Sequence, residues 1–137
     1  MNSSLGIWCC LFAVGVSACA SASAPGGIDR HVEDRVTLST GVYGQTTSQD
    51  DIGDSPVKYK QMMLSVSAGA GDSPLATKTS DGVGFYEFPL TPGDYSLCTS
   101  FGRCTALHVE TGQCVRLDYE FSEGPGWSAP VVGVCPH

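Results

Sequence analysis

Positive charge is scarce in this chain of 137 residues. Seven lysines and arginines face 14 aspartates and glutamates, and the formal net charge is -7. Only Lys58 and Lys60 lie close together, whereas binding to a phosphate backbone needs clustered basic side chains. The composition therefore argues against nucleic acid as a partner, and against attraction to anionic lipid headgroups.

Patterns typical of catalytic and metal sites are also missing. His31, His108 and His137 are far apart and have no zinc-ligand spacing. The acidic stretch 50–54 lacks the regular spacing of a calcium loop, and no Gly-x-Ser-x-Gly nucleophile elbow occurs. We expect no cofactor, no metal and no catalytic activity; the less favoured alternative is a hydrolase with an unrecognised site.

Long apolar runs are absent except at the start of the chain. The first 28 residues carry no charged side chain, and residues 5–18 form a largely apolar run. This run is too short to span a bilayer as a helix, which needs about 20 residues. It fits the apolar region of a signal peptide, although no lysine or arginine precedes it. We predict export, with a signal peptide over residues 1–18.

The cysteine count bears on where that peptide is cut. Seven cysteines are an odd number, which is awkward in an exported protein. Cys9 and Cys10 would leave with the signal peptide, and Cys19 stands at its boundary. The remaining set is even and suits disulfides: Cys98, Cys104, Cys114 and Cys135. If Cys19 is chemically modified, no cysteine of the mature protein is left without a role.

The motif "VSAC" (residues 16–19) resembles the lipobox of bacterial lipoproteins. This resemblance implies cleavage before Cys19 and attachment of lipid to its thiol, which would anchor the protein stably in a membrane. Residue 20 is alanine rather than aspartate, which by the same resemblance points to the outer membrane in a Gram-negative cell. The alternative is ordinary secretion with cleavage after Ala20. Residues 19–35 would form a flexible tether, and residues 36–137 one folded domain.

From Val36 onward the apolar residues follow a period of two, as in half-buried strands. The clearest case is residues 113–122, where Val115, Leu117, Tyr119 and Phe121 would face inward and Arg116, Asp118 and Glu120 outward. Gly- and Pro-rich turns separate the expected strands. This pattern predicts an all-β, antiparallel β-sandwich of about seven strands.

Residues 79–100, "TSDGVGFYEFPLTPGDYSLCTS", resemble the carboxypeptidase-regulatory-like family of the transthyretin (prealbumin-like) group. The spacing between Phe88 and Leu90 is one residue shorter than in that family, and its usual Gly-x-Pro turn is not recognisable. The resemblance implies a Greek-key sandwich serving as a non-catalytic module of an exported protein. The matching positions are Asp81, Gly84, Tyr86, Phe88, Pro92, Gly93, Tyr95 and Leu97.

Four cysteines allow three disulfide pairings. A hairpin register that places Tyr95 opposite Leu107 also places Cys98 opposite Cys104, which makes this pair the first choice. Cys114–Cys135 would then fasten the C-terminal tail to the last long strand. A Cys98–Cys114 bridge remains an alternative.

Four aromatic residues lie near expected loops and offer contacts to a carbohydrate or a protein of the envelope. They are Tyr43, Tyr59, Phe101 and Trp127. The sequence therefore predicts a lipid-anchored envelope protein with a binding or structural β-sandwich module. The alternative is a freely secreted domain of the same kind.

Overall fold

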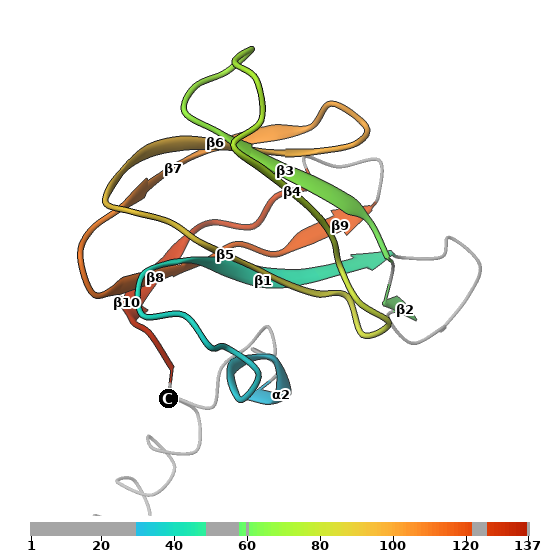
Figure 1. Ribbon diagram of the computed structural model, residues 1–137. Helices are drawn as coiled ribbons and strands as arrows, with labels where there is room; N and C mark the ends of the chain where they lie inside the picture. Colours follow the sequence, from blue (N-terminus) through green and yellow to red (C-terminus); the bar gives the residue numbers. More distant parts are fainter. Residues whose placement is uncertain (1–29, 49–57, 60, 122–125, 137) are drawn as a thin grey trace, which may run out of the picture.

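The computed structural model describes residues 30–48, 58–59, 61–121 and 126–136, and within them the fold is nearly all β (Figure 1). A single turn of helix, α2 (Arg30–Glu33), precedes the first described strand. The strands are β1 (Gly41–Ser48), β2 (Lys58–Tyr59), β3 (Met63–Ser67), β4 (Ala76–Thr79), β5 (Phe85–Pro89), β6 (Gly93–Thr99), β7 (Cys104–Val109), β8 (Gln113–Arg116), β9 (Tyr119–Phe121) and β10 (Val131–Val134).

The strands form two sheets, so the architecture is sandwich-like. One sheet has the order β4-β3-β6-β7; in the other, β10-β8-β1-β2, both β5 and β9 also pair with β1. Apolar residues of the period-two pattern form the main core, and both sheets contribute side chains to it. Its buried residues are Val42, Met62, Leu64, Val66, Tyr86, Phe88, Leu97, Leu107, Val109, Val115, Leu117 and Tyr119.

The prediction of purely antiparallel pairing is wrong for the sheet that contains β1. This strand runs antiparallel to β5 and β2 but parallel to β8 and β9. All four strands of the β4-β3-β6-β7 sheet lie between β1 and β8 in the sequence. No hairpin therefore fixes the relative direction of β1 and β8. At the gap between β8 and β9, a carboxylate oxygen of Asp118 accepts the backbone N–H of Gln45 at 2.9 Å. A side chain thereby replaces one rung of the ladder.

Asp81 holds the turn before β5, within the family-like motif of residues 79–100. The Asp81 carboxylate accepts the backbone N–H groups of Val83 and Phe85, both at 3.0 Å. Gly84 has a φ of +77°, and a Cβ there would lie 2.2 Å from the carbonyl oxygen of Thr46. The motif residues thus dock the turn onto β1, because only glycine suits both the dihedral angle and the close approach.

The folded part begins earlier than the predicted boundary at residue 36. Val32 in α2 is 2% exposed and packs in a second buried cluster with Val36, Leu38, Tyr43 and the Cys114–Cys135 pair. Residues 30–35 therefore belong to the domain and not to a tether. Val36 and Leu38 are buried, but they precede the first described strand, which begins at Gly41 and not at Val36, where the period-two pattern starts.

Two residues of the clearest predicted strand face a different environment from the one expected. Phe121 is 39% exposed, because β9 ends at the edge of the core. Arg116 does point away from the main core, yet it is 4% exposed because the second cluster covers that face. Its Nε donates to Asp118, and its Nη1 lies 4.0 Å from Glu33 of α2.

The structure contains the disulfides Cys98–Cys104 and Cys114–Cys135. These are the two pairs that the sequence favours, and β6 and β7 pair in the predicted register, with Tyr95 opposite Leu107. The second bridge joins β8 to the residue that follows β10. None of the helical residues described here forms a segment long and apolar enough to cross a membrane.

Candidate binding surface

The turn between β6 and β7 is a compact, internally bonded loop. The Thr99 N–H donates to the Arg103 carbonyl at 2.9 Å, and the Gly102 N–H donates to the Thr99 carbonyl at 3.0 Å. The Ser100 N–H donates to the carbonyl of Met63 at 3.0 Å, which ties the loop to β3. These hydrogen bonds, together with the Cys98–Cys104 disulfide that closes the loop, hold the backbone that carries Phe101 and Arg103.

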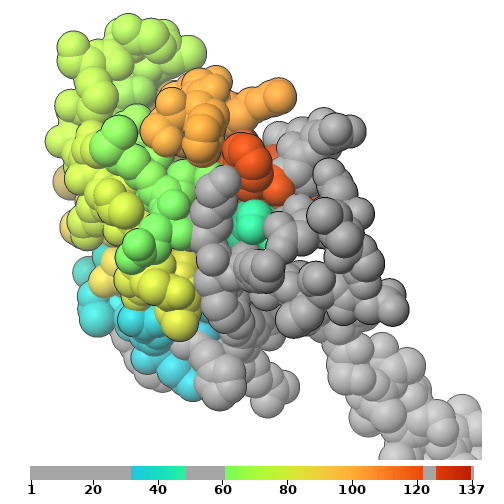
Figure 2. Space-filling model, turned by 90° about the vertical axis from the view of Figure 1, so that its right-hand side faces the viewer, coloured from blue at the N-terminus to red at the C-terminus, as the bar shows by residue number. Residues whose placement is uncertain are grey.

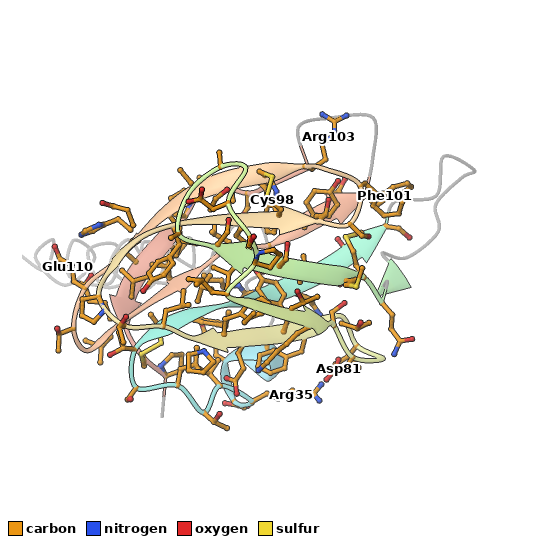
Figure 3. All side chains as sticks on the ribbon, turned by 45° about the horizontal axis from the view of Figure 1, so that its top comes forward. Arg35, Asp81, Cys98, Phe101, Arg103 and Glu110 are labelled. Atoms are coloured by element: carbon orange, nitrogen blue, oxygen red, sulfur yellow. A yellow bond between two sulfur atoms is a disulfide. The ribbon has the colours of Figure 1, made fainter. Side chains whose placement is uncertain are left out.

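Phe101 meets an aromatic side chain of the opposite sheet. Its ring centroid lies 5.2 Å from that of Phe121 at the end of β9, with the rings tilted by 47°. The two residues are 58% and 39% exposed. The side-chain view shows Phe101 at one end of the sandwich and Arg103 extending from the same turn (Figure 3). Exposed apolar rings at the junction of two sheets form a contact surface that the hydrophobic core does not use.

Trp127 links this end of the molecule to the same turn. Its indole Nε1 donates to the Arg103 carbonyl at 3.1 Å, and its ring packs edge-on against Tyr119 with centroids 5.0 Å apart. Gly126 has a φ of +83°, and a Cβ there would lie 2.5 Å from the Tyr119 ring. Glycine at 126 therefore allows the indole to approach the turn. We call Phe101, Arg103, Phe121 and Trp127 the aromatic tip.

Arg103 supplies the charge of the aromatic tip. Its side chain is exposed and has no ion-pair partner among the residues that the structure describes. Arg35, by contrast, pairs with Asp81 at 2.5 Å, and Arg116 is buried beside Asp118. In the space-filling view, the orange β6–β7 turn lies beside the red-orange atoms of the β8–β9 segment (Figure 2). Aromatic and arginine side chains are both enriched at protein–protein interfaces relative to the rest of the surface.

A second polar group lies on the exposed face of the β6–β7 hairpin. His108 Nδ1 lies 2.7 Å from an Asp94 carboxylate oxygen, and Nε2 lies 3.6 Å from Glu110. The hydrogen bond to Asp94 raises the pKa of His108 above its usual value, and the charges of Asp94 and Glu110 act in the same direction. Within the described residues no three potential ligands gather to hold a metal ion. The group adjusts the charge of this face of the hairpin.

The aromatic residues singled out in the sequence have different positions. Phe101 and Trp127 meet at the aromatic tip, but Tyr43 is 5% exposed, and burial is the main cause that raises the pKa of its hydroxyl. The Tyr59 side chain and Cys19 lie outside the described residues. Phe121 was missed because strict alternation assigns it to the core, although its place near the end of an apolar strand was a usable signal.

Comparison of the chain with protein-family models, with curated proteins and with solved structures finds no match in any of the three. The case for a function therefore depends on the sequence motifs and on the geometry described above.

Proposed function

We propose that this chain is a lipid-anchored bacterial envelope protein and that its β-sandwich is a non-catalytic, transthyretin-like binding module of Greek-key type. The observation that carries the proposal is the pair of disulfides in a chain with an uncharged, apolar start that runs into a lipobox-like motif. Disulfides persist in oxidising compartments such as the bacterial periplasm or the cell surface. This agrees with export, and export places Cys19 within reach of lipid-attaching enzymes.

The local structure of the family-like motif supports the proposed fold group. Asp81 and Gly84 build the turn before β5, Tyr86 and Phe88 face the core from β5, and Leu97 does so from β6. This local arrangement of one turn and two core-facing strands is what supports the proposed fold group.

The anchor is tested by the intact mass of the protein from the membrane fraction, beside a Cys19→Ala variant. We expect a chain that begins at Cys19 and carries acyl mass. The two disulfides lower its mass by four hydrogens relative to the reduced chain. The variant should lose the acyl mass and leave the membrane fraction, since acyl chains contribute about 0.8 kcal/mol per buried methylene.

A soluble, unmodified chain that begins at Ser21 would instead identify a freely secreted domain. A chain that keeps Met1 would overturn the export hypothesis. The disulfide mass deficit is read from the same spectrum, so failure of lipid attachment does not hide failure of disulfide formation.

The aromatic tip is the surface that we propose for binding, and its chemistry favours a protein partner. The Phe101 and Phe121 rings are tilted against each other and do not form one flat platform for a sugar ring. An exposed apolar ring and an arginine carried by the same turn instead fit a partner segment that offers both an apolar side chain and a carboxylate. The chain's net charge of -7 makes Arg103 a local attraction on an otherwise acidic molecule.

A photo-crosslinking amino acid at position 101 in native envelopes tests this assignment. Position 75 is the matched control, because Leu75 is 62% exposed but lies before β4, outside the aromatic tip. We expect one discrete protein adduct from position 101, none from position 75, and loss of the adduct when Arg103→Glu is added. Equal labelling at both positions, or labelling unaffected by Arg103→Glu, would contradict a specific surface. A glycan adduct would move the assignment to carbohydrate.

A further inference from the structure

The Cys98–Cys104 disulfide joins directly opposed residues on neighbouring antiparallel strands. The next pair along, Thr99 and Arg103, carries the backbone hydrogen bond of the ladder. Since bonded and non-bonded pairs alternate, the two cysteines occupy a non-bonded position, in accord with their Cα separation of 4.0 Å. The ladder between β6 and β7 is therefore complete without the sulfur bridge, which can open without removing a strand from the sheet.

The two disulfides differ in their access to solvent. Cys104 is exposed and Cys98 is half-buried, whereas Cys114 and Cys135 are 2% and 4% exposed in the second cluster. Thiol–disulfide exchange requires a thiolate to reach one of the sulfurs. Ser96 Oγ lies 3.7 Å from the Cys98 sulfur and can donate to a thiolate formed there. Of the two bridges, only Cys98–Cys104 meets the conditions for exchange.

Opening this bridge acts on the aromatic tip. The disulfide closes the loop that contains Phe101, and the carbonyl of Arg103, next to Cys104, accepts hydrogen bonds from Thr99 and from the Trp127 indole. Without the covalent closure, the loop gains conformational freedom that a partner must remove on binding. The oxidised bridge thus prepares the surface for its partner.

We propose that Cys98–Cys104 is a thiol–disulfide exchange site that sets the order of the aromatic tip, whereas Cys114–Cys135 is structural. The co-reactant is a dithiol reductant. Its thiolate attacks the Cys104 sulfur, the S–S bond breaks, and the Cys98 thiolate leaves and takes up a proton. The second thiol of the reductant then displaces Cys104 from the mixed disulfide. Two electrons and two protons pass to the cysteines, and the dithiol becomes a disulfide. The consequence for binding rests on the proposed function; the exchange itself does not.

The experiment uses the full chain with Trp8→Phe, so that Trp127 is the only tryptophan whether or not the N-terminus is processed. Graded dithiothreitol is followed by alkylation and peptide mapping of each cysteine. We expect Cys98 and Cys104 to be alkylated at least about tenfold faster than Cys114 and Cys135, while the circular dichroism of the sheets is retained. Trp127 emission should change in step with labelling of Cys98 and Cys104.

The Cys98→Ser/Cys104→Ser double variant is the matched control. It should show the Trp127 emission of the reduced protein and should not respond to dithiothreitol. Equal alkylation rates at the two bridges would overturn the exchange site. Selective alkylation with unchanged Trp127 emission would overturn its effect on the aromatic tip. Cysteine mapping does not depend on lipid attachment or on a partner, so both outcomes are independent of the proposed function.

Discussion

Gly44→Ala is expected to abolish the stable fold, with a loss of about 4 kcal/mol or more in the free energy of unfolding. Gly44 lies in the middle of β1, where this strand passes the segment between β8 and β9. A Cβ there would lie 1.8 Å from the carbonyl oxygen of Leu117 and 2.9 Å from the Tyr86 hydroxyl. Both obstacles are buried, so neither can move aside into solvent.

The Leu117 backbone is fixed from two sides, which is why it cannot yield. Its N–H donates to the Tyr43 carbonyl at 2.9 Å, and its carbonyl accepts the buried Tyr86 hydroxyl. Burial is the first cause that raises the pKa of Tyr86 well above its ordinary value, so the hydroxyl keeps its proton and remains a donor. Moving Leu117 away from an added methyl group would break this contact and leave buried polar groups unpaired.

Gly82→Ala is the matched control for this experiment. No heavy atom lies within 4 Å of the added Cβ at position 82, and Gly82 is not among the glycines with positive φ. Its expected effect is within about 0.5 kcal/mol. Urea denaturation of the oxidised proteins, followed by circular dichroism, compares the two variants. If Gly44→Ala unfolds at the same urea concentration as Gly82→Ala, the close contact between β1 and Leu117 does not exist.

The main core could be predicted from the sequence because alternation reports local burial. Val115, Leu117 and Tyr119 are each buried, on the face that the pattern assigns to them. Sheet order could not be predicted in this way, since the parallel pairing of β1 with β8 joins segments far apart in the chain. The hydrophobic period carries no information about the neighbour on the far side of such a connection.

The candidate site was predictable only in part, for the same physical reason. The hairpin register favoured the Cys98–Cys104 pair and placed Phe101 in the turn, because both features are local. Phe121 and Trp127 reach that turn through the packing of one sheet on the other, and no short spacing encodes this. The burial of Arg116 likewise depends on α2. Small and polar residues surround α2 in the sequence, and for this reason the sequence pattern assigns it to the tether.

Replacing Cys114 and Cys135 together by alanine is expected to lower the free energy of unfolding by about 3 kcal/mol, because the bridge closes a loop with a sequence separation of 21. The loss should be concentrated in the C-terminal tail. The apolar side chains of β10, Val131, Val132 and Val134, are 53%, 54% and 83% exposed, so packing contributes little to holding this strand. Among the described residues, β10 is held mainly by its backbone pairing with β8 and by the bridge itself.

Cys98→Ala/Cys104→Ala is the comparison that separates the two bridges. It opens a loop with a sequence separation of only 6, and the paired residues of β6 and β7 still hold the hairpin. The chain-entropy model therefore gives a stability loss about 1 kcal/mol smaller. Urea denaturation measures both losses, and amide hydrogen exchange shows where they occur. Loss of protection at Val131–Val134 is expected only in the Cys114→Ala/Cys135→Ala variant. If β10 keeps its protection there, backbone pairing with β8 is sufficient to order the tail, and the buried bridge would not be the structural one.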